Sequence, residues 1–356
     1  MTNRGIGAGD VMNSDATSAD IVLSVRNLKT QFKTRHGVVD AVADNSFDIR
    51  SGETVALVGE SGSGKSVTAL SVLHLLEETG SIANGEVIFD GRDITHLGEK
   101  AMRKVRGQEI SMIFQDPATC LDPVFTVEHQ LVEALTIHRS YDEAAAKDRA
   151  LELLQRVGMP DPESRMDSYP HQLSGGQRQR VMIAMALALE PKLVIADEPT
   201  TALDVTVQAQ ILDLLRMLQA EQGAAILFVT HDLGVVAEMA DRVVVMYAGI
   251  AVEQGTVREV LKDPQHPYTE ALLRSMPGRV AGTGERLTAI DGNVPSLFDM
   301  PDGCRFEPRC PHAMDRCRDE LPDLISISDG RASRCWLRDE STVLTLSADA
   351  MTGATQ

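Results

Sequence analysis

A phosphate-binding loop most constrains what this chain can fold into. Residues 59–66, Gly-Glu-Ser-Gly-Ser-Gly-Lys-Ser, fit the pattern G-x-x-x-x-G-K-[ST] and follow the apolar run at 54–58. Residues 67–73 continue with apolar side chains at helical spacing. The sequence therefore predicts a buried strand, a tight loop and a helix whose first N–H groups point at bound phosphate. An ordinary Gly/Ser-rich turn is the alternative, and this context disfavours it.

Each residue type in this loop has a chemical reason. Glycines let the main chain approach phosphate oxygens where a Cβ would interfere. We expect Lys65 to reach the β- and γ-phosphates and the Ser66 hydroxyl to bind Mg²⁺. The residues expected to contact the nucleotide here are Gly59, Ser61, Gly62, Ser63, Gly64, Lys65 and Ser66.

A second apolar strand, at 193–196, ends in two carboxylates, Asp197 and Glu198. We expect Asp197 to hold Mg²⁺ through water, because Mg²⁺ keeps several of its waters and accepts one or two protein carboxylates. Glu198 is then free to act as general base on the attacking water. An isolated pair of this kind would be a solvated turn, but its place behind a phosphate loop favours hydrolysis of a nucleotide.

Between these motifs stands Leu-Ser-Gly-Gly-Gln at 173–177. With it, residues 21–279 resemble the ATP-binding subunits of ABC transporters. The resemblance implies an α/β fold: a RecA-like core, an antiparallel β layer and an inserted helical subdomain, with ATP and Mg²⁺ as cofactors. It also implies that one signature loop caps the γ-phosphate of ATP bound to the opposite subunit; this loop comprises Ser174, Gly175, Gly176 and Gln177.

Four further residues receive roles from the same resemblance. Gln115 would sense the γ-phosphate and help to hold Mg²⁺, and His231 would contact the γ-phosphate and orient the water. Asp204 falls in the loop that crosses the dimer interface in this family. Phe32 would stack on adenine, and an ordinary core phenylalanine is the alternative.

The spacing of the motifs predicts the domain organisation. The stretch between Lys65 and Asp197 is longer than one strand–helix unit needs, and segments 131–135, 150–157 and 181–189 have apolar residues at helical intervals. We expect the antiparallel β layer at 21–50 and 85–89. The expected divisions are a disordered tail at 1–20, the nucleotide-binding domain at 21–280 with its helical subdomain at 117–188, a small Cys-rich extension at 281–340 and a tail at 341–356.

Composition narrows the class of protein and its location. The 356 residues carry 34 basic and 52 acidic side chains, a formal charge of −18, which argues against a nucleic-acid surface. The longest apolar stretch, near 181–189, is far too short to span a bilayer, and no signal peptide is visible. We expect a peripheral protein at the cytoplasmic face of the membrane. The resemblance implies its partners: a second ATPase, two integral membrane permease subunits and, indirectly, an extracytoplasmic solute-binding protein.

The C-terminal region suggests what the ATPase drives. From residue 265 onward the sequence is rich in Pro, Arg and Cys. It resembles the extension of the oligopeptide/dipeptide-importer ATPases, and the chain is similar to the first ATPase of their pair. This implies a subunit that hydrolyses ATP to power import of di- or oligopeptides, paired with a different ATPase. The alternatives are the same role for nickel, an oligosaccharide or a glutathione-like solute, or a non-transport ABC ATPase.

Four cysteines in the extension raise the question of a metal. Family members can carry a [4Fe–4S] cluster on Cys304, Cys310, Cys317 and Cys335, and four thiolates are suitable cluster ligands. Their spacings lack the tight C-x-x-C pairs of common zinc sites, and disulfides are disfavoured in a reducing cytosol. A cluster, a zinc site and metal-free thiols all stay open at this point. Cys120 is interpreted as a core or groove residue.

Overall fold

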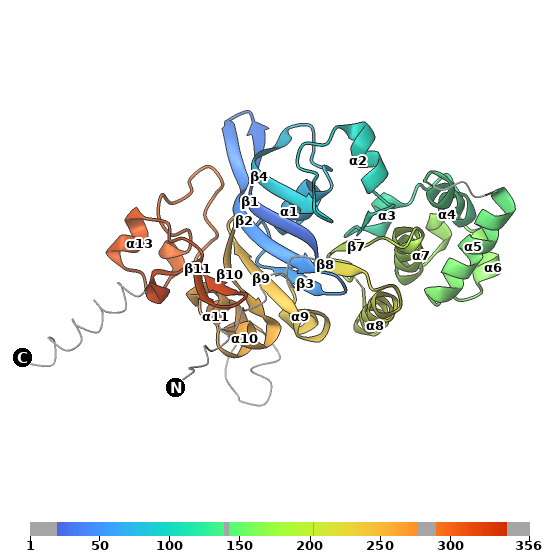
Figure 1. Ribbon diagram of the computed structural model, residues 1–356. Coiled ribbons are helices and arrows are strands. Elements are labelled where there is room, and N and C mark those ends of the chain that lie inside the picture. Colours follow the sequence, from blue (N-terminus) through green and yellow to red (C-terminus); the bar gives the residue numbers. More distant parts are fainter. Residues whose placement is uncertain (1–19, 139–141, 202, 277–289, 340–356) are drawn as a thin grey trace, which may run out of the picture.

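The computed structural model of the chain describes residues 20–138, 142–201, 203–276 and 290–339. The tails expected at 1–20 and 341–356 lie outside the described residues apart from residue 20, as do the first residues of the expected extension. Figure 1 shows a central sheet with a group of helices at one end, α4 to α6, and the Cys-rich extension with α13 at the other.

The strands and helices have the following bounds. The strands are β1 (Ile21–Thr34), β2 (Gly37–Arg50), β3 (Thr54–Val58), β4 (Gly80–Phe89), β5 (Arg92–Asp93), β6 (Ile110–Ile113), β7 (Leu193–Asp197), β8 (Ala225–Thr230), β9 (Arg242–Tyr247), β10 (Ile250–Thr256), β11 (Ile325–Ser328) and β12 (Arg331–Ser333). The α-helices are α1 (Lys65–Val72), α2 (Glu99–Val105), α3 (Pro117–Cys120), α4 (Val127–Thr136), α5 (Glu143–Arg156), α6 (Pro162–Met166), α7 (Gly175–Leu187), α8 (Val205–Gln222), α9 (Leu233–Met239), α10 (Val257–Lys262), α11 (Pro267–Arg274) and α13 (Asp315–Asp319). Short 3₁₀ turns are η1 (Pro170–Gln172), η2 (Glu307–Arg309) and η3 (Trp336–Arg338).

The predicted α/β core with an antiparallel layer is confirmed. The strands follow the order β5-β4-β1-β2-β10-β9-β3-β8-β7-β6. Strands β6, β7, β8, β3 and β9 pair in parallel, whereas β1 pairs antiparallel with both β2 and β4. Every residue of β3, β7 and β8 is buried, as expected for parallel strands covered on both faces. The phosphate loop, Glu198 and His231 follow the carboxyl ends of β3, β7 and β8, which brings them together.

Strand β4 is longer than its sequence pattern suggested. We expected it at 85–89, but it begins at Gly80. Gly85 has a φ of 94° beside a register irregularity in the β1–β4 pair, and most of the residues before it are exposed. A bulged, solvated strand has no regular alternation of apolar and polar residues, so the first half escaped notice.

Helices α3 to α7 are inserted between β6 and β7, and they share one apolar core with the sheet. The helical segments expected at 131–135 and 150–157 fall within α4 and α5, apart from the final residue. Helix α7 begins at Gly175, earlier than the expected 181, because Ser174 and Gln177 form a reciprocal capping box at its start. The signature loop is therefore the N-terminus of a helix.

The C-terminal extension packs on the core through both strands and side chains. Strand β12 pairs antiparallel with β10. Phe306 is fully buried against the rings of Tyr247 and Tyr268. Buried Arg334 donates to the carboxylate of Asp44 at 2.7 Å.

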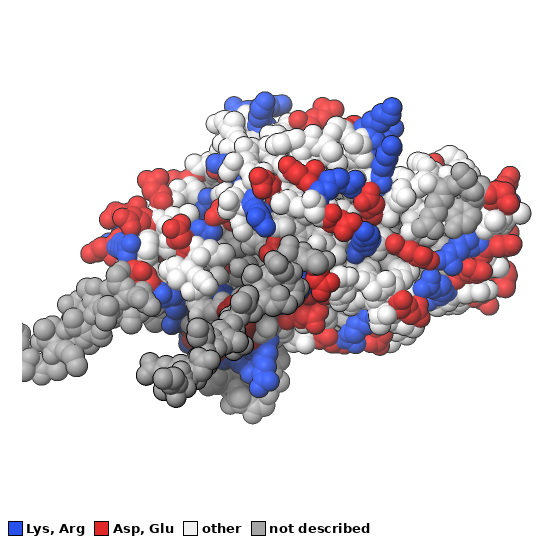
Figure 2. Space-filling view, in the orientation of Figure 1, with Lys and Arg blue, Asp and Glu red and all other residues white. Residues whose placement is uncertain are grey.

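Surface charge and helix length bear on where the protein acts. On the face shown in Figure 2, basic and acidic side chains are interspersed. Among the described helices, none is long and apolar enough to cross a membrane.

Candidate nucleotide-binding site

The phosphate loop connects β3 to α1 and needs glycine at defined positions. Gly64, the residue before α1, has a φ of 95°, and a Cβ there would lie 2.7 Å from the carbonyl oxygen of Ala41. A Cβ on Gly59 would lie 2.1 Å from the carbonyl oxygen of Met246. Side chains at these two positions would collide with backbone, so the tight loop depends on their absence.

Lys65 is the first residue of α1, and its side chain reaches back into the phosphate loop. Its side chain is almost fully buried, and its Nζ donates to the carbonyl oxygens of Gly59 at 2.8 Å and Glu60 at 3.0 Å. Burial lowers the pKa of the ammonium group, while the carboxylates of Glu198 and Asp197 oppose that shift. A cation held by neutral carbonyls beside the loop N–H groups is well placed for phosphate oxygens.

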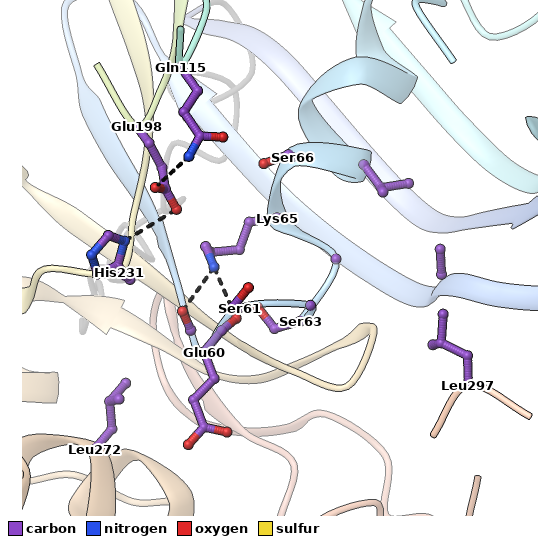
Figure 3. A pocket seen from close by; sticks show the side chains of 15 residues that line it. Glu60, Ser61, Ser63, Lys65, Ser66, Gln115, Glu198, His231, Leu272 and Leu297 are labelled. Atoms are coloured by element: carbon purple, nitrogen blue, oxygen red, sulfur yellow. Dashed lines mark hydrogen bonds and ion pairs between the residues drawn. The ribbon is translucent and has the colours of Figure 1, made fainter. Parts of the chain in front are cut away.

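Glu198 is held by side chains that follow strands β6, β7 and β8, and Figure 3 shows the contacts with Gln115 and His231. Its Oε1 lies 3.2 Å from Nδ1 of His231, after β8. Its Oε2 accepts from Nε2 of Gln115, after β6, at 3.2 Å and from Oγ1 of Thr201 at 2.9 Å. These contacts fix the carboxylate beside the phosphate loop, in the arrangement that a general base for a bound water requires.

Asp197 and Ser66 place two oxygen atoms side by side that could hold Mg²⁺. The Ser66 hydroxyl donates to Oδ1 of Asp197 at 3.0 Å. Burial raises the pKa of the Asp197 carboxyl, and the Ser66 hydrogen bond opposes that shift. A hydroxyl and a carboxylate side by side are the hard oxygen donors that Mg²⁺ prefers, so the residues present fit this ion.

Lys65, Ser66 and Glu198 line a pocket of about 670 Å³, whereas Asp197 is buried behind Ser66 and is not among its lining residues. In Figure 3, Gln115, Glu198 and His231 stand together at one end, while Leu297 lies at the other. The lining residues are Ala41, Gly59 to Val67, Gln115, Glu198, His231, Leu272 and Leu297. Its size, and the Lys65 ammonium group and loop N–H groups that line it, suit a nucleoside triphosphate.

The signature loop lies in a different pocket. Ser174 caps α7, and Asp204 caps α8 by accepting from the N–H groups of Thr206 and Val207, each at 3.0 Å. Both helix N-termini face a pocket of about 760 Å³. Its lining includes Ser174, Gly175, Gly176, Gln177 and Asp204. Within one chain, the fold thus does not bring the signature loop to the phosphate loop.

Phe32 is not among the described residues that line either pocket. It lies on β1, and a Cβ on Gly80 would be 2.8 Å from its ring, which shows close packing against the start of β4. The adenine contact of Phe32 stays a prediction.

Sequence reasoning missed several residues of the site. Thr201 follows Glu198 by one helical turn's spacing and could have been noticed there. Segments far along the chain contribute Leu272 and Leu297 to the pocket. They also contribute Arg309, which pairs with the Glu60 side chain. Their sequence surroundings carry no signal of a nucleotide.

The four extension cysteines surround one small cavity of about 10 Å³, room for about one water molecule. Burial raises the pKa of the Cys304 thiol to about 12 and that of Cys335 to about 11, and neighbouring thiols act in the same direction. All five cysteines are free of disulfides. No group of three or more His, Cys, Asp or Glu side chains in the described ranges is arranged to hold a metal ion. Of the three alternatives left open by the sequence, this arrangement supports neither the cluster nor the zinc site.

An apolar pocket of about 260 Å³ lies between the core and the inserted helices. Cys120 lines it, as expected of a groove residue, together with Phe114 and Leu121. Phe114 directly precedes Gln115, which contacts Glu198. The groove is therefore linked to Glu198 through Gln115 and its side-chain hydrogen bond.

Comparisons with known proteins agree with the geometry. Residues 42–201 match the family described as "ABC transporter", and residues 252–317 match "Oligopeptide/dipeptide transporter, C-terminal region". A probable peptide ABC transporter ATP-binding protein of Sinorhizobium fredii, y4tR, is 53% identical over 323 residues, which cover 90% of this chain and 96% of the relative. The chain belongs to the ABC transporter family. Both parts of the resemblance seen in the sequence are confirmed.

Other relatives of this ABC ATPase extend the comparison. The oligopeptide transport ATP-binding protein AppD of Bacillus subtilis is 51% identical over 320 residues, covering 90% of this chain and 97% of the relative. The dipeptide transport ATP-binding protein DppD of Escherichia coli is 49% identical over 314 residues, with coverage of 88% and 96%. The ATP-binding cassette MJ0796, solved as a dimer with ADP and Pi in a post-hydrolysis state, superposes with a TM-score of 0.60 at 30% identity, covering 66% of this chain and 99% of that one. The ABC ATPase fold and an activity of ATP hydrolysis coupled to transport follow.

Proposed function

We propose that this subunit hydrolyses ATP to drive import of di- or oligopeptides across the cytoplasmic membrane. The proposal depends on the match of residues 252–317 to the C-terminal region of oligopeptide/dipeptide transporters. Relatives named for peptide, dipeptide and oligopeptide transport match almost their whole length to this chain. Nickel, oligosaccharides and glutathione-like compounds are the alternative solutes.

The pocket suggests how hydrolysis proceeds. Lys65 and the loop N–H groups hold the phosphates. Ser66, Asp197 and Gln115 would hold Mg²⁺, which when bound would neutralise charge that develops on the phosphate oxygens. Glu198 accepts the proton of a water whose oxygen attacks the γ-phosphorus. The bond from this phosphorus to the β–γ bridging oxygen breaks, and ADP and phosphate leave. His231 holds Glu198 and orients the water.

We propose that two ATPase subunits complete each other's sites. The signature residues and Asp204 lie in a pocket separate from the phosphate loop, at the N-termini of helices α7 and α8. Such N-termini carry partial positive charge that favours the γ-phosphate of ATP held by another subunit. The second subunit would be a different ATPase of the same family.

The apolar groove supports a role for membrane partners. The exposed apolar atoms of the groove suit contact with a permease segment. Phe114 lines the groove and the next residue, Gln115, hydrogen-bonds Glu198, so a movement of the permease segment would be transmitted to Glu198. We propose two integral membrane permease subunits as the partners, with an extracytoplasmic solute-binding protein acting through them. The subunit would sit peripherally at the cytoplasmic face.

We further propose that the four extension cysteines bind a [4Fe–4S] cluster once they lose their protons and their side chains turn, with zinc as the alternative metal. All four cysteines line one small cavity, which supports the proposal. Among the described residues no three such side chains are yet placed to hold a metal ion, so the thiols would have to turn towards one another. Anaerobic purification followed by iron, sulfide and zinc analysis tests it. About four irons and sulfides per chain, lost in Cys310→Ser, would support the cluster; a metal-free chain would contradict it.

Uptake by cells tests the transport function. Cells lacking the gene receive either the wild-type subunit or Glu198→Gln, and accumulation of a labelled dipeptide, nickel and a labelled oligosaccharide is followed. We expect the wild type to restore dipeptide accumulation and the variant to fail. Restoration of nickel or oligosaccharide uptake with no effect on the dipeptide would contradict the peptide assignment.

A further inference from the structure

The Cys-rich extension touches the phosphate loop through one arginine. Arg309, in η2, donates from Nη1 to Oε2 of Glu60 at 2.8 Å and from Nη2 to Oε1 at 3.1 Å. The Arg309 side chain is only 4% exposed. Two parallel charge-assisted hydrogen bonds in a place largely closed to solvent fix position and orientation better than a single contact.

Arg309 is itself held firmly by the extension and the core. Its guanidinium donates to the carbonyl oxygens of Asp291 at 2.9 Å and Ile290 at 3.3 Å, and to the hydroxyl of Tyr247 at 3.3 Å. It also stands 5.7 Å from the centre of the Tyr247 ring. These partners leave the guanidinium little freedom, so it acts as a rigid clamp on Glu60.

Glu60 passes this constraint to the nucleotide-binding groups. Its backbone N–H donates to the hydroxyl of Tyr268 at 2.9 Å, and its carbonyl oxygen accepts from Nζ of Lys65 at 3.0 Å. Arg309 therefore holds Glu60, one of the two residues whose carbonyl oxygens accept hydrogen bonds from Lys65. Movement of the Glu60 side chain would move that carbonyl and the loop N–H groups after it.

A second part of the extension reaches the same pocket. Leu297, twelve positions before Arg309 in the sequence, lines it together with Ala41 and Val67. Figure 3 shows Leu297 across the phosphate loop from Glu198 and His231. The extension thus borders the pocket at the end away from the reacting phosphate.

We propose that Arg309 is a positioning residue for nucleotide binding, and that the Cys-rich extension sets ATP affinity by holding the phosphate loop through Glu60. The inference rests on the proposed use of this pocket for ATP. It makes the extension a working part of the ATP site. A change in the extension, such as a change at the neighbouring Cys310, would then be felt as a change in nucleotide affinity.

Nucleotide titration of the full chain tests the proposal. The dissociation constant for a fluorescent ATP analogue is measured for wild type, Arg309→Gln, Glu60→Gln and the double variant. We expect each single change to raise the dissociation constant about tenfold, equivalent to about 1.4 kcal/mol, and the double variant to equal either single one. Arg309→Lys, which keeps the charge without the fork, should fall between.

A matched control comes from the same extension. Arg318 is 65% exposed and pairs at 3.0 Å with Glu307, which stands in the same 3₁₀ turn as Arg309, so its loss disturbs this turn without removing the contact with Glu60. Arg318→Gln should bind the analogue within about twofold of wild type. Thermal unfolding checks that each variant is folded; if Arg309→Gln does not fold, Glu60→Gln tests the same pair from the other side.

Kinetics separate positioning from mere attachment of the extension. If Arg309 positions the loop, the KM for ATP rises while kcat stays near wild type, because Glu198 and its partners are untouched. An unchanged dissociation constant in folded Arg309→Gln or Glu60→Gln, or strictly additive effects in the double variant, would overturn the proposal. If wild type fails to bind the analogue, the ATP assignment itself fails.

Discussion

Replacing Glu198 by Gln should remove the proposed general base and little else. The two side chains have the same length, and a glutamine amide can keep partners among Gln115 and Thr201, which now lie 3.2 Å and 2.9 Å from Oε2. An amide cannot take a proton from water at neutral pH. General-base catalysis contributes about 10²- to 10⁴-fold, so turnover should fall by at least about 10², a barrier increase of about 2.7 kcal/mol or more.

Nucleotide binding should survive this change. Lys65 and the phosphate loop are untouched, and the loss of a negative charge near the γ-phosphate favours ATP, so the dissociation constant should stay within about threefold. Phosphate release gives the turnover, and titration with a fluorescent ATP analogue gives the affinity. Turnover within about threefold of wild type would refute the assignment of Glu198.

Glu190 provides a matched control for Glu198→Gln. It is also a glutamate with a left-handed backbone, at φ 55° against 44° for Glu198. Its carboxylate pairs with Arg149 at the surface, at 3.0 Å. Such exposed pairs contribute little, so Glu190→Gln should hydrolyse ATP within about twofold of wild type.

Three further predictions concern the loop, the metal and pH. In Gly64→Ala, the added Cβ meets the Ala41 carbonyl at 2.7 Å, so binding of the ATP analogue should drop at least about tenfold by titration, whereas unchanged affinity would show that the loop tolerates a side chain. Ser66→Ala removes the hydroxyl beside Asp197, so the Mg²⁺ concentration for half-maximal hydrolysis should rise about tenfold; an unaltered Mg²⁺ dependence would argue against a magnesium ligand. Burial lowers the pKa of His266 to about 3, so below pH 6.5 protons bind the unfolded chain first. The free energy of unfolding should therefore fall by up to about 1.4 kcal/mol per pH unit as pH drops towards 3. His266→Asn can keep the helix cap. In urea titrations, its free energy of unfolding should fall less between pH 7 and pH 5 than that of the wild type. An equal fall in both proteins would contradict this.

The core and its ATP motifs were predictable because each combines a local pattern with a strict physical need. The strand at 54–58 is a continuous apolar run, since parallel strands are buried on both faces. Gly64, Lys65 and Ser66 follow from the geometry of phosphate binding. The Ser-x-x-Gln pattern of the capping box that starts α7 at Gly175 is also visible in the sequence. The Gly-Gly pair argued against a helix there, because glycine disfavours helix.

Long-range partners were not predictable from local patterns. Arg309 meets Glu60 across 249 positions, and neither residue stands in a pattern that requires the other. The position of Phe32 depends on how β1 packs on Gly80, which tertiary structure decides. The cysteine spacing likewise did not reveal that the four thiols share one small cavity.

A structure of Glu198→Gln with ATP and Mg²⁺, together with its partner ATPase, tests the central claim most directly. We predict the γ-phosphate between Lys65 of this chain and the signature loop of the partner, with Mg²⁺ beside Ser66 and Asp197. The signature loop that begins at Ser174 should face ATP bound to the partner. Nucleotide bound elsewhere, or held without any signature loop against its γ-phosphate, would contradict the account.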